Sequence, residues 1–404
     1  MSRSGRGHVT GPLAFYAEGF REDLMGRGYT WGSAARQVHL MAHLSRWLDS
    51  CGLELSDVTP EALERFVDVR RGEGYARWVG RRATAPLLDY LIGQGVVAAV
   101  RSPIPSSVER LVQRYERYLT RERGLAAASI RSYVRVAHRF LADVSIGEDL
   151  QIGDIGAAGV AGFVRRECGR RGQSPAAAKV TVTGTRSLLR FLYAENLMPR
   201  LLTGAVPSVA SWQLASLPKA INATELACLL KSCDRRSARG RRDFAVLTVL
   251  ARLGLRAGEV AALQLADIDW RQGQIMVRGK GGRQEWLPLP VDVGEAVVGW
   301  LLRGRPAGIA CAAVFVRLRA PQGSLSSNGV SAVVRRASRR AGLHPIGAHR
   351  LRHTAATDVL RAGGTLAEVG QLLRHSRLQT TTVYAKVDVL ALSAVAQPWP
   401  GARP

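Results

Sequence analysis

The chain has 404 residues and no apolar run near the roughly 20 residues that a membrane-spanning helix needs. Its first residues, MSRSGRGHVTGPL, contain no apolar core and so do not resemble a secretory signal. The five cysteines are odd in number and scattered, which excludes a disulfide framework and a zinc site as predictions. We therefore expect a soluble, cytosolic protein with no membrane partner.

Acidic residues are also few. The chain has 32 Asp and Glu against 57 Lys and Arg, a net charge of +25 and a pI of about 11.1. Only five of the basic residues are lysine, a bias that a GC-rich genome explains; such a genome does not explain the excess of bases over acids. This charge predicts a polyanionic partner, with nucleic acid first among them.

Hydrophobic residues make up 47% of the chain, enough for well-packed cores, and the length predicts two to four domains. Apolar residues recur at helical spacing through most of the sequence, and prolines interrupt this pattern near residues 103 and 199. We predict two helical domains, at 1–100 and 103–200, followed by a linker at 201–220. A further domain follows at 221–396, and a tail at 397–404.

The first two blocks resemble each other. The segment from Arg27 to Ser33 corresponds to the segment from Arg123 to Ser129 at an offset of 96. Farther on, Asp57 and the pair Phe66-Val67 correspond to Asp154 and Phe163-Val164 at an offset of 97. We interpret this as an internal repeat that produces tandem helical domains. The alternative is a chance match between two unrelated helical blocks.

In the third block, Asn222 followed by Glu225 predicts a helix start. Short strands are predicted at 274–278 and 284–289, on either side of a Gly279–Gly282 hairpin turn. The sequence GKGG at this turn lacks the GxxxxGK[ST] spacing and the following helix of a nucleotide-binding loop. The predicted fold class is therefore mainly α with a small antiparallel β-sheet.

The most informative stretch runs from residue 349 to residue 384. His349, Arg352 and His353 crowd one predicted helix start, and Gly363-Gly364 ends that helix. Thr365, three residues before Glu368, predicts the capped start of a second helix that ends near His375, and Tyr384 follows. Such a site suits a phosphodiester, because it supplies cations for the charge, imidazoles for hydrogen bonds and a phenol for attack.

These residues and two earlier segments together resemble the tyrosine recombinases, the phage-integrase family. Leu253–Val260 (LGLRAGEV) resembles the family's first arginine box, and Lys280, 24 residues after Arg256, resembles its β-hairpin lysine. The boxes HRLRH from His349 and LLRH up to His375 are similar to the family's HxLRH and LLGH boxes, and Tyr384 stands where the nucleophile stands. The resemblance therefore rests on five boxes in order.

The resemblance implies a role for each residue. Arg256 and Arg352 would neutralise the non-bridging phosphate oxygens, and Tyr384 would attack the phosphorus to form a 3′-phosphotyrosine. His349 would accept the tyrosine proton, His375 would hydrogen-bond a non-bridging oxygen, and Lys280 would protonate the departing 5′-oxygen or contact a backbone phosphate. Glu259 would support an arginine or histidine, and His353 is either a supporting group or a neutral core residue.

At position 374 the chain has arginine where the family usually has glycine. This implies either an altered local backbone or an additional phosphate contact. His39 and His43 have the spacing of a metal-binding pair, but without a third ligand we interpret them as a solvated or DNA-facing surface. The mechanism implied needs neither a metal nor another cofactor.

The resemblance implies a site-specific recombinase or integrase of a mobile element, acting in integration, excision or transposition. Its partner would be double-stranded DNA, held between tandem helical clamp domains and a catalytic domain. It would work as a homotetramer on DNA, with partner recombinases possible, in the bacterial cytoplasm on the nucleoid. The predicted apolar helix at 387–395 would pack on a neighbouring subunit or within its own chain. The alternatives are a type IB topoisomerase-like nicking-closing enzyme and a catalytically silent DNA-binding regulator.

Overall fold

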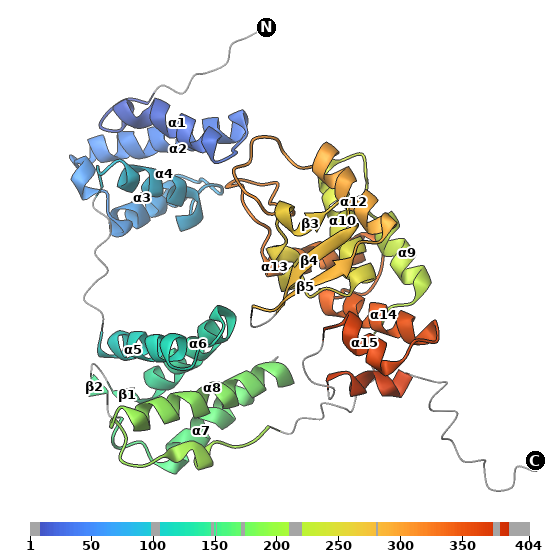
Figure 1. Cartoon of the computed structure of the whole chain (residues 1–404). Coiled ribbons are helices and arrows are strands. Elements are labelled where there is room, and N and C mark those ends of the chain that lie inside the picture. Colours follow the sequence, from blue (N-terminus) through green and yellow to red (C-terminus); the bar gives the residue numbers. More distant parts are fainter. Residues whose placement is uncertain are drawn as a thin grey trace, which may run out of the picture. The chain divides into compact units, whose positions relative to one another are not determined.

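The structure is a computed structural model that describes residues 9–97, 106–146, 149–150, 152–170, 174–209, 220–279, 282–374 and 380–387. It is mostly helical, with a two-stranded and a three-stranded antiparallel sheet in the described ranges (Figure 1). The predicted fold class is confirmed. The contacts between residues in space divide the chain into two compact units. One unit comprises Met1–Ala99 and Leu214–Pro404, and the other comprises Val100–Gln213. None of the described helices is long and apolar enough to cross a membrane.

Residues 9–97 form a helical block with a core of its own, which includes Phe20, Leu44 and Phe66. Thr59 caps a helix that has Pro60 in its first turn. The elements are η1 (Ala14–Tyr16), α1 (Ala17–Gly26), α2 (Trp31–Ser50), η2 (Leu55–Asp57), α3 (Pro60–Gly72) and α4 (Arg81–Gly93).

The unit Val100–Gln213 repeats this arrangement of four helices around a separate core that includes Tyr115, Phe140 and Leu192. Its elements are α5 (Ser107–Arg121), α6 (Ala127–Val144), β1 (Ser145–Ile146), β2 (Asp149–Leu150), α7 (Ala157–Cys168), α8 (Pro175–Ala194) and η3 (Leu202–Ala205). Helix α6 begins 96 residues after α2, and α7 begins 97 residues after α3. These spacings equal the two offsets of the predicted repeat.

Residues 220–387 contain the predicted site. Their elements are α9 (Ala223–Lys231), α10 (Ala238–Leu253), α11 (Ala257–Ala262), η4 (Leu265–Asp267), β3 (Ile268–Asp269), β4 (Gln274–Arg278), β5 (Gln284–Pro288), α12 (Val291–Arg303), α13 (Ser327–Arg340), α14 (Ala348–Arg361), α15 (Leu366–Leu372) and η6 (Thr382–Val387). The predicted start at Asn222 is confirmed, because its side chain and that of Glu225 cap α9 reciprocally.

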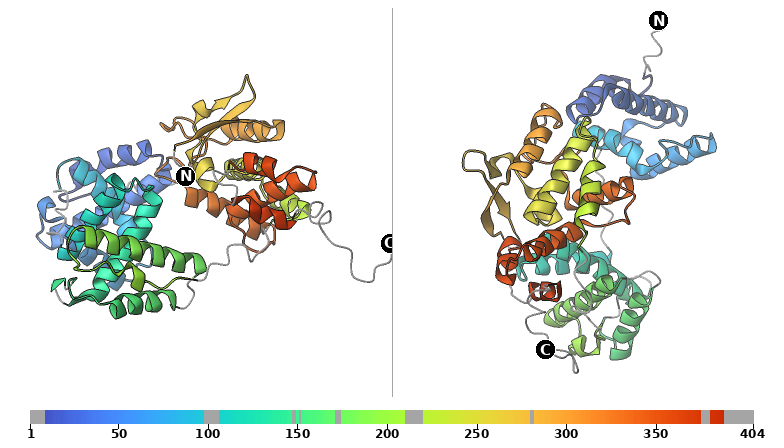
Figure 2. Two further views of the ribbon diagram at one scale, coloured as in Figure 1. Left: turned by 60° about the horizontal axis from the view of Figure 1, so that its bottom comes forward. Right: turned by 90° about the vertical axis from the view of Figure 1, so that its right-hand side faces the viewer.

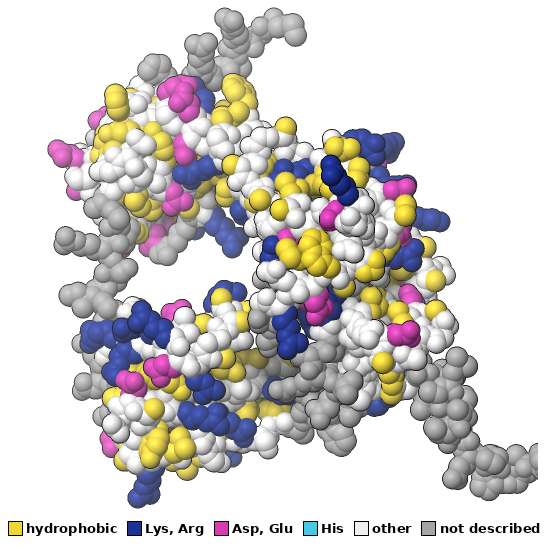
Figure 3. Space-filling view, in the orientation of Figure 1, with side chains coloured by type: hydrophobic (Ala, Val, Ile, Leu, Met, Phe, Trp, Pro, Cys, Tyr) yellow, Lys and Arg dark blue, Asp and Glu magenta, His cyan; other side chains and the backbone are white. Residues whose placement is uncertain are grey.

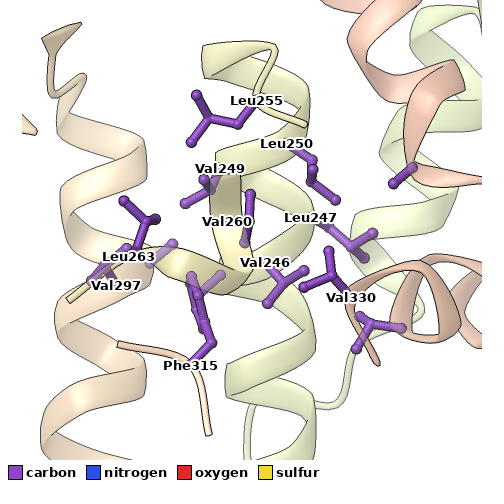
Figure 4. Close-up of a cluster of buried hydrophobic side chains, with 14 of the residues drawn as sticks. Val246, Leu247, Val249, Leu250, Leu255, Val260, Leu263, Val297, Phe315 and Val330 are labelled. Atoms are coloured by element: carbon purple, nitrogen blue, oxygen red, sulfur yellow. The ribbon is translucent and has the colours of Figure 1, made fainter. Parts of the chain in front are cut away.

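Helix α10 is the centre of this core. Val246, Leu247, Val249 and Leu250 are all buried along it, and side chains of α12, α13 and the turn after α10 surround them (Figure 4). Residues 245–251 of α10 are all buried, as expected for a stretch of helix that other elements cover on every side. On α12, Trp300 is fully buried and donates its indole N–H to the carbonyl oxygen of Val314 at 2.8 Å.

The three-stranded sheet has the order β3-β4-β5, and β4 pairs with β5 over Gln274–Arg278 and Gln284–Pro288. The predicted hairpin is thus confirmed, with the amide of Gly279 bonded to the carbonyl oxygen of Arg283 at 2.7 Å. Figure 2 shows this hairpin extending away from the helices. Arg278, the last residue of β4 before the turn, forms an ion pair with the buried Asp267.

Helices α14 and α15 pack with η6 around a small apolar cluster, to which Leu360, Val369 and Leu373 belong (Figure 1). Gly363 adopts a φ of 87° after α14, as expected for the predicted helix stop. The predicted capping box is also confirmed, because Thr365 and Glu368 each bond the backbone amide of the other. This hairpin of helices brings the first histidine box close to η6, which carries Tyr384.

Trp300→Ala should destabilise the region 220–387 by about 4 kcal/mol, because it opens a large cavity and removes the indole hydrogen bond. Calorimetry of the full chain should show the corresponding transition falling by about 10 °C. The matched control is Trp270→Ala, since Trp270 is 48% exposed. A shift as small as that of the control would contradict the central place of Trp300 in this core.

Candidate active site

The turn between α10 and α11 positions the first predicted arginine. Gly254 ends α10 with a φ of 57°, a left-handed conformation that favours glycine. A Cβ here would lie 3.0 Å from Leu373 and 3.4 Å from Ala355, so the turn packs closely against α14 and the end of α15. Arg256 then becomes the N-cap of α11, and its side chain stays 40% exposed. A substrate could therefore reach its guanidinium.

Glu259, one turn into α11, is the acceptor at the centre of the site. Its side chain is buried, its Oε1 accepts from Arg256 Nη1 at 2.6 Å, and its Oε2 accepts from the Arg256 amide at 2.8 Å. Burial by itself would raise the pKa of Glu259. The Arg256 amide and the charges of Arg374 and Arg256 outweigh burial, however, and hold this pKa below its usual value. Glu259 is thus a buried, ionised carboxylate.

Arg352 on α14 is the second predicted arginine, and it is almost completely buried. It donates from Nη1 to the carbonyl oxygen of Gly254 at 2.6 Å and from Nη2 to the carbonyl oxygen of Leu373. Burial and the charge of Arg256 lower its pKa to about 10, so the group stays protonated near neutral pH. Arg352 thereby links α14 to the α10–α11 turn and to the end of α15.

Arg374, where the family has glycine, also belongs to this cluster. Its Nη2 donates to Glu259 Oε2 at 2.7 Å, and its side chain is 6% exposed. Its φ is 51°, so the backbone keeps the left-handed conformation that a glycine would adopt. The two predicted alternatives, an altered local backbone and an additional phosphate contact, stay predictions. The sequence shows the arginine at this position, but no local pattern in it predicts Glu259 as the partner.

Tyr384 lies in the same site. It is 2% exposed, and its hydroxyl lies 2.8 Å from Nδ1 of His353. Burial raises the pKa of Tyr384 to about 12, although the charges of Arg352 and Arg256 act to lower it. The phenol is therefore protonated near neutral pH, and both arginines are close enough to stabilise the phenolate.

The two histidines of α14 lie side by side, with ring centroids 4.4 Å apart. Burial and the charge of His349 lower the pKa of His353 to about 4. The pKa of His349 is also lowered, by partial loss of water and by the charges of Arg352 and Arg256, although much of the side chain stays exposed. Both rings are thus neutral near pH 7. The histidine in contact with the tyrosine is His353, and not His349, for which the resemblance implied this contact.

Two predicted residues, Lys280 and His375, lie outside the described residues. The described strands β4 and β5 flank the first, and Arg374 immediately precedes the second. His39 and His43 lie on α2, with their Nε2 atoms 3.2 Å apart. In sequence they are far from the predicted catalytic residues. The structure therefore brings together Arg256, Glu259, His349, Arg352, His353 and Tyr384 from the predicted set, and adds Arg374.

Comparison with protein families gives matches for two parts of the chain. Residues 219–390 match the phage integrase family, and residues 112–196 match the phage integrase N-terminal SAM-like domain. The first match includes all the boxes that carry the predicted resemblance, and the second lies within the predicted second helical domain.

Individual relatives extend these matches. The protein y4rA of Sinorhizobium fredii, named an integrase/recombinase, is 40% identical over 396 residues, which are 97% of this chain and 95% of y4rA. The tyrosine recombinase XerD of Mycobacterium tuberculosis is 33% identical over 309 residues, which are 72% of this chain and 97% of XerD. The match with y4rA is long enough to include most of the first helical block.

Solved structures share the fold. The site-specific recombinase XerH, bound to a palindromic difH substrate in a post-cleavage complex, superposes with a TM-score of 0.57 at 19% identity, over 74% of this chain and 98% of XerH. A lambda integrase dimer bound to a core site gives a TM-score of 0.53 at 17% identity, over 80% of this chain and 90% of that chain.

The lowered pKa of His353 predicts how stability depends on pH. A histidine with a pKa of about 4 in the folded state and 6.5 when unfolded contributes stability above pH 6.5 that is lost as the pH falls towards 4. Between pH 7 and pH 5 this loss should be about 1 kcal/mol, after discounting for partial exposure. His353→Asn should therefore lose that much less stability than wild type over this interval, as measured by urea unfolding.

The matched control for this prediction is His344→Asn, which removes an exposed histidine. It should keep the wild-type difference between the two pH values. If His353→Asn keeps that difference as well, His353 is not held neutral in the folded chain.

Proposed function

We propose that Tyr384 is the nucleophile of this chain, which belongs to the phage integrase family of tyrosine recombinases. Members of this kind are site-specific DNA recombinases, and so is this chain. The observation that carries the proposal is the position of the Tyr384 hydroxyl, which lies 2.8 Å from a neutral histidine and within the field of Arg352 and Arg256. A phenol in such surroundings can lose its proton when a phosphate binds between it and the arginines.

In this mechanism, Arg256 and Arg352 bind the two non-bridging oxygens of the scissile phosphate. Planar guanidinium groups suit these oxygens, which gain negative charge as the pentacovalent transition state forms. The Tyr384 oxygen attacks phosphorus, the bond from phosphorus to the 5′-oxygen breaks, and a 3′-phosphotyrosine results. Attack by the 5′-hydroxyl of another strand reverses these steps and joins the strands in a new order.

The proton of Tyr384 is assigned to His353 rather than to His349. Nδ1 of His353 lies 2.8 Å from the Tyr384 hydroxyl, and it can take the phenol proton in the neutral tautomer that carries its own proton on Nε2. His349 is more exposed and lies in the field of both arginines, which suits a hydrogen bond to a phosphate oxygen. We keep the roles inferred from the family for Lys280, as the acid that protonates the 5′-oxygen, and for His375, as a further donor to the phosphate.

Exchange of both strands between two duplexes breaks four phosphodiesters, and each chain supplies one Tyr384. We therefore propose a homotetramer on double-stranded DNA, in the cytoplasm and on the nucleoid. A topoisomerase-like enzyme would use the same chemistry, but the names of y4rA and XerD favour recombination. Integration, excision and transposition all remain within this proposal, as does a partner recombinase.

The helical block at residues 9–97 would serve as an additional DNA-clamp domain. Three observations support this proposal: a four-helix arrangement like that of the next block, helix starts at the offsets of the predicted repeat, and a match with y4rA that covers nearly the whole chain. The unit Val100–Gln213 would be the main DNA-clamp domain. Figure 3 shows many more Lys and Arg than Asp and Glu side chains on the visible face of this unit.

A cluster of arginines on the catalytic region supplies a second contact with the DNA backbone. A cavity of about 450 Å³ is lined by Arg239, Arg242, Arg317, Arg319 and Arg336. Asp243 lies against this cluster and is already paired with Arg242 at 2.8 Å. Burial and the neighbouring arginines lower the pKa of Arg336, although Asp243 opposes them. Bound phosphate would relieve this repulsion between like charges.

Tyr384→Phe should abolish covalent attachment to DNA and leave duplex affinity near the wild-type value, because only the nucleophilic oxygen is removed. Denaturing gels of a nicked suicide duplex, cut from the flanks of the native gene, measure the adduct. Tyr193→Phe, at a position 46% exposed on α8, is the matched control and should form the adduct normally. A protease-sensitive adduct from Tyr384→Phe would show that another residue is the nucleophile.

The double change Arg317→Ala with Arg319→Ala should weaken DNA binding uniformly across sequences. The slope of log K against log salt should become shallower by about 2, or roughly one for each phosphate that an arginine no longer neutralises. Arg303→Ala is the control, because Arg303 lines a different cavity that also contains Asp292 and Glu295. An unchanged salt slope would remove the arginine cluster from the DNA interface.

A further inference from the structure

Arg374 holds an unfavourable position that a glycine would fill without strain. Its φ of 51° lies in the left-handed region, which few residues other than glycine, asparagine and aspartate adopt. The side chain is nevertheless buried at 6% exposure and extends to Glu259. A strained residue that is held by specific contacts at a functional site points to a role for its side chain.

The contacts of Arg374 place it against Glu259, the carboxylate that also binds Arg256. Nη2 donates to Glu259 Oε2 at 2.7 Å, and Nη1 donates to the carbonyl oxygen of Leu372 at 3.1 Å. Nε is buried and has no hydrogen-bond partner among the described residues, although a carboxylate oxygen of Glu285, on β5, lies 4.0 Å away. Arg374 therefore lies between Glu259 and the hairpin that carries Lys280.

The hydrogen bonds to Glu259 decide which arginines are neutralised. Arg256 and Arg374 together occupy both carboxylate oxygens, at 2.6 to 2.8 Å. Arg352 lies 4.0 Å from Oε2, beyond hydrogen-bond distance, and bonds instead to two backbone carbonyl oxygens. One carboxylate thus serves three guanidinium groups, and the cluster has a net charge of +2. Without Arg374 the net charge would be +1, and Glu259 could draw Arg352 towards itself.

We propose that Arg374 is a positioning residue that shares Glu259 with Arg256 and so keeps the positive charge of Arg352 available for the scissile phosphate. The proposal rests on the proposed function, because it assumes that the phosphate binds at Arg352 and Arg256. Its consequence is electrostatic: the contribution of Arg374 should depend on the negative charge of the phosphate. A purely structural residue would act equally on charged and neutral substrates.

The test compares two forms of one nicked suicide duplex, with the scissile phosphate as a phosphodiester or as an uncharged methylphosphonate. Arg374→Gly removes the charge and suits the left-handed backbone, whereas Arg374→Lys keeps the charge. On the phosphodiester, Arg374→Gly should slow single-turnover adduct formation by about 100-fold, with duplex affinity within about threefold of wild type. Arg374→Lys should recover most of this rate. On the methylphosphonate, wild type and Arg374→Gly should differ by less than about fivefold.

Two results would overturn the proposal: wild-type rates for Arg374→Gly on the phosphodiester, or an equal loss on both substrates. If the melting transition shows that Arg374→Gly does not fold, Arg374→Lys provides the test instead. A loss of about 100-fold in the rate of adduct formation by Arg374→Lys would contradict a role for the charge. Failure of the proposed function looks different, because wild type itself would then form no adduct on a duplex that it binds.

Discussion

A single buried carboxylate, that of Glu259, connects the parts of the chain that form the site. It lies one turn into α11 and accepts hydrogen bonds from Arg256 on its own helix and from Arg374 at the end of α15. Burying a charge is unfavourable unless the charge is paired and hydrogen-bonded, so this position requires the arginines around it. The same pairing fixes two guanidinium groups that would otherwise be long, mobile side chains.

The rest of the fold places elements around this carboxylate. The well-packed core along α10 carries the chain to Gly254, whose left-handed turn directs Arg256 into α11. Arg352 reaches across from α14 to the carbonyl oxygen of that same glycine. The small cluster between α14, α15 and η6 then holds Tyr384 against His353. Core packing therefore positions the side chains of the site, and the ion pairs with Glu259 determine which arginine charges remain available to a substrate.

Local signals in the sequence predicted much of this structure. Helix starts at Asn222 and Thr365 could be identified because each of these side chains, and the glutamate three residues later, bonds the backbone amide of the other. The hairpin followed from two short predicted strands on either side of a glycine-rich turn. The boxes with Arg256, Arg352 and Tyr384 could be identified from their order, and the structure brings these three residues together.

The remaining features depend on contacts between distant residues. His349 and His353 are four apart on one helix face, so the sequence could not show which ring meets Tyr384; the position of η6 favours His353. The partner of Arg374 is 115 residues away, and no local pattern points to Glu259. The signal available was the unusual arginine itself, and its meaning required the folded chain.

The account depends on Glu259 more than on any other residue, and single-turnover cleavage by Glu259→Gln tests it most directly. Glutamine preserves the shape but removes the charge that holds the arginines in place. We expect adduct formation on a suicide duplex to slow by about 100-fold, with duplex affinity changed by less than about threefold. If Glu259→Gln cleaves at the wild-type rate, the carboxylate does not organise the site and the account is wrong.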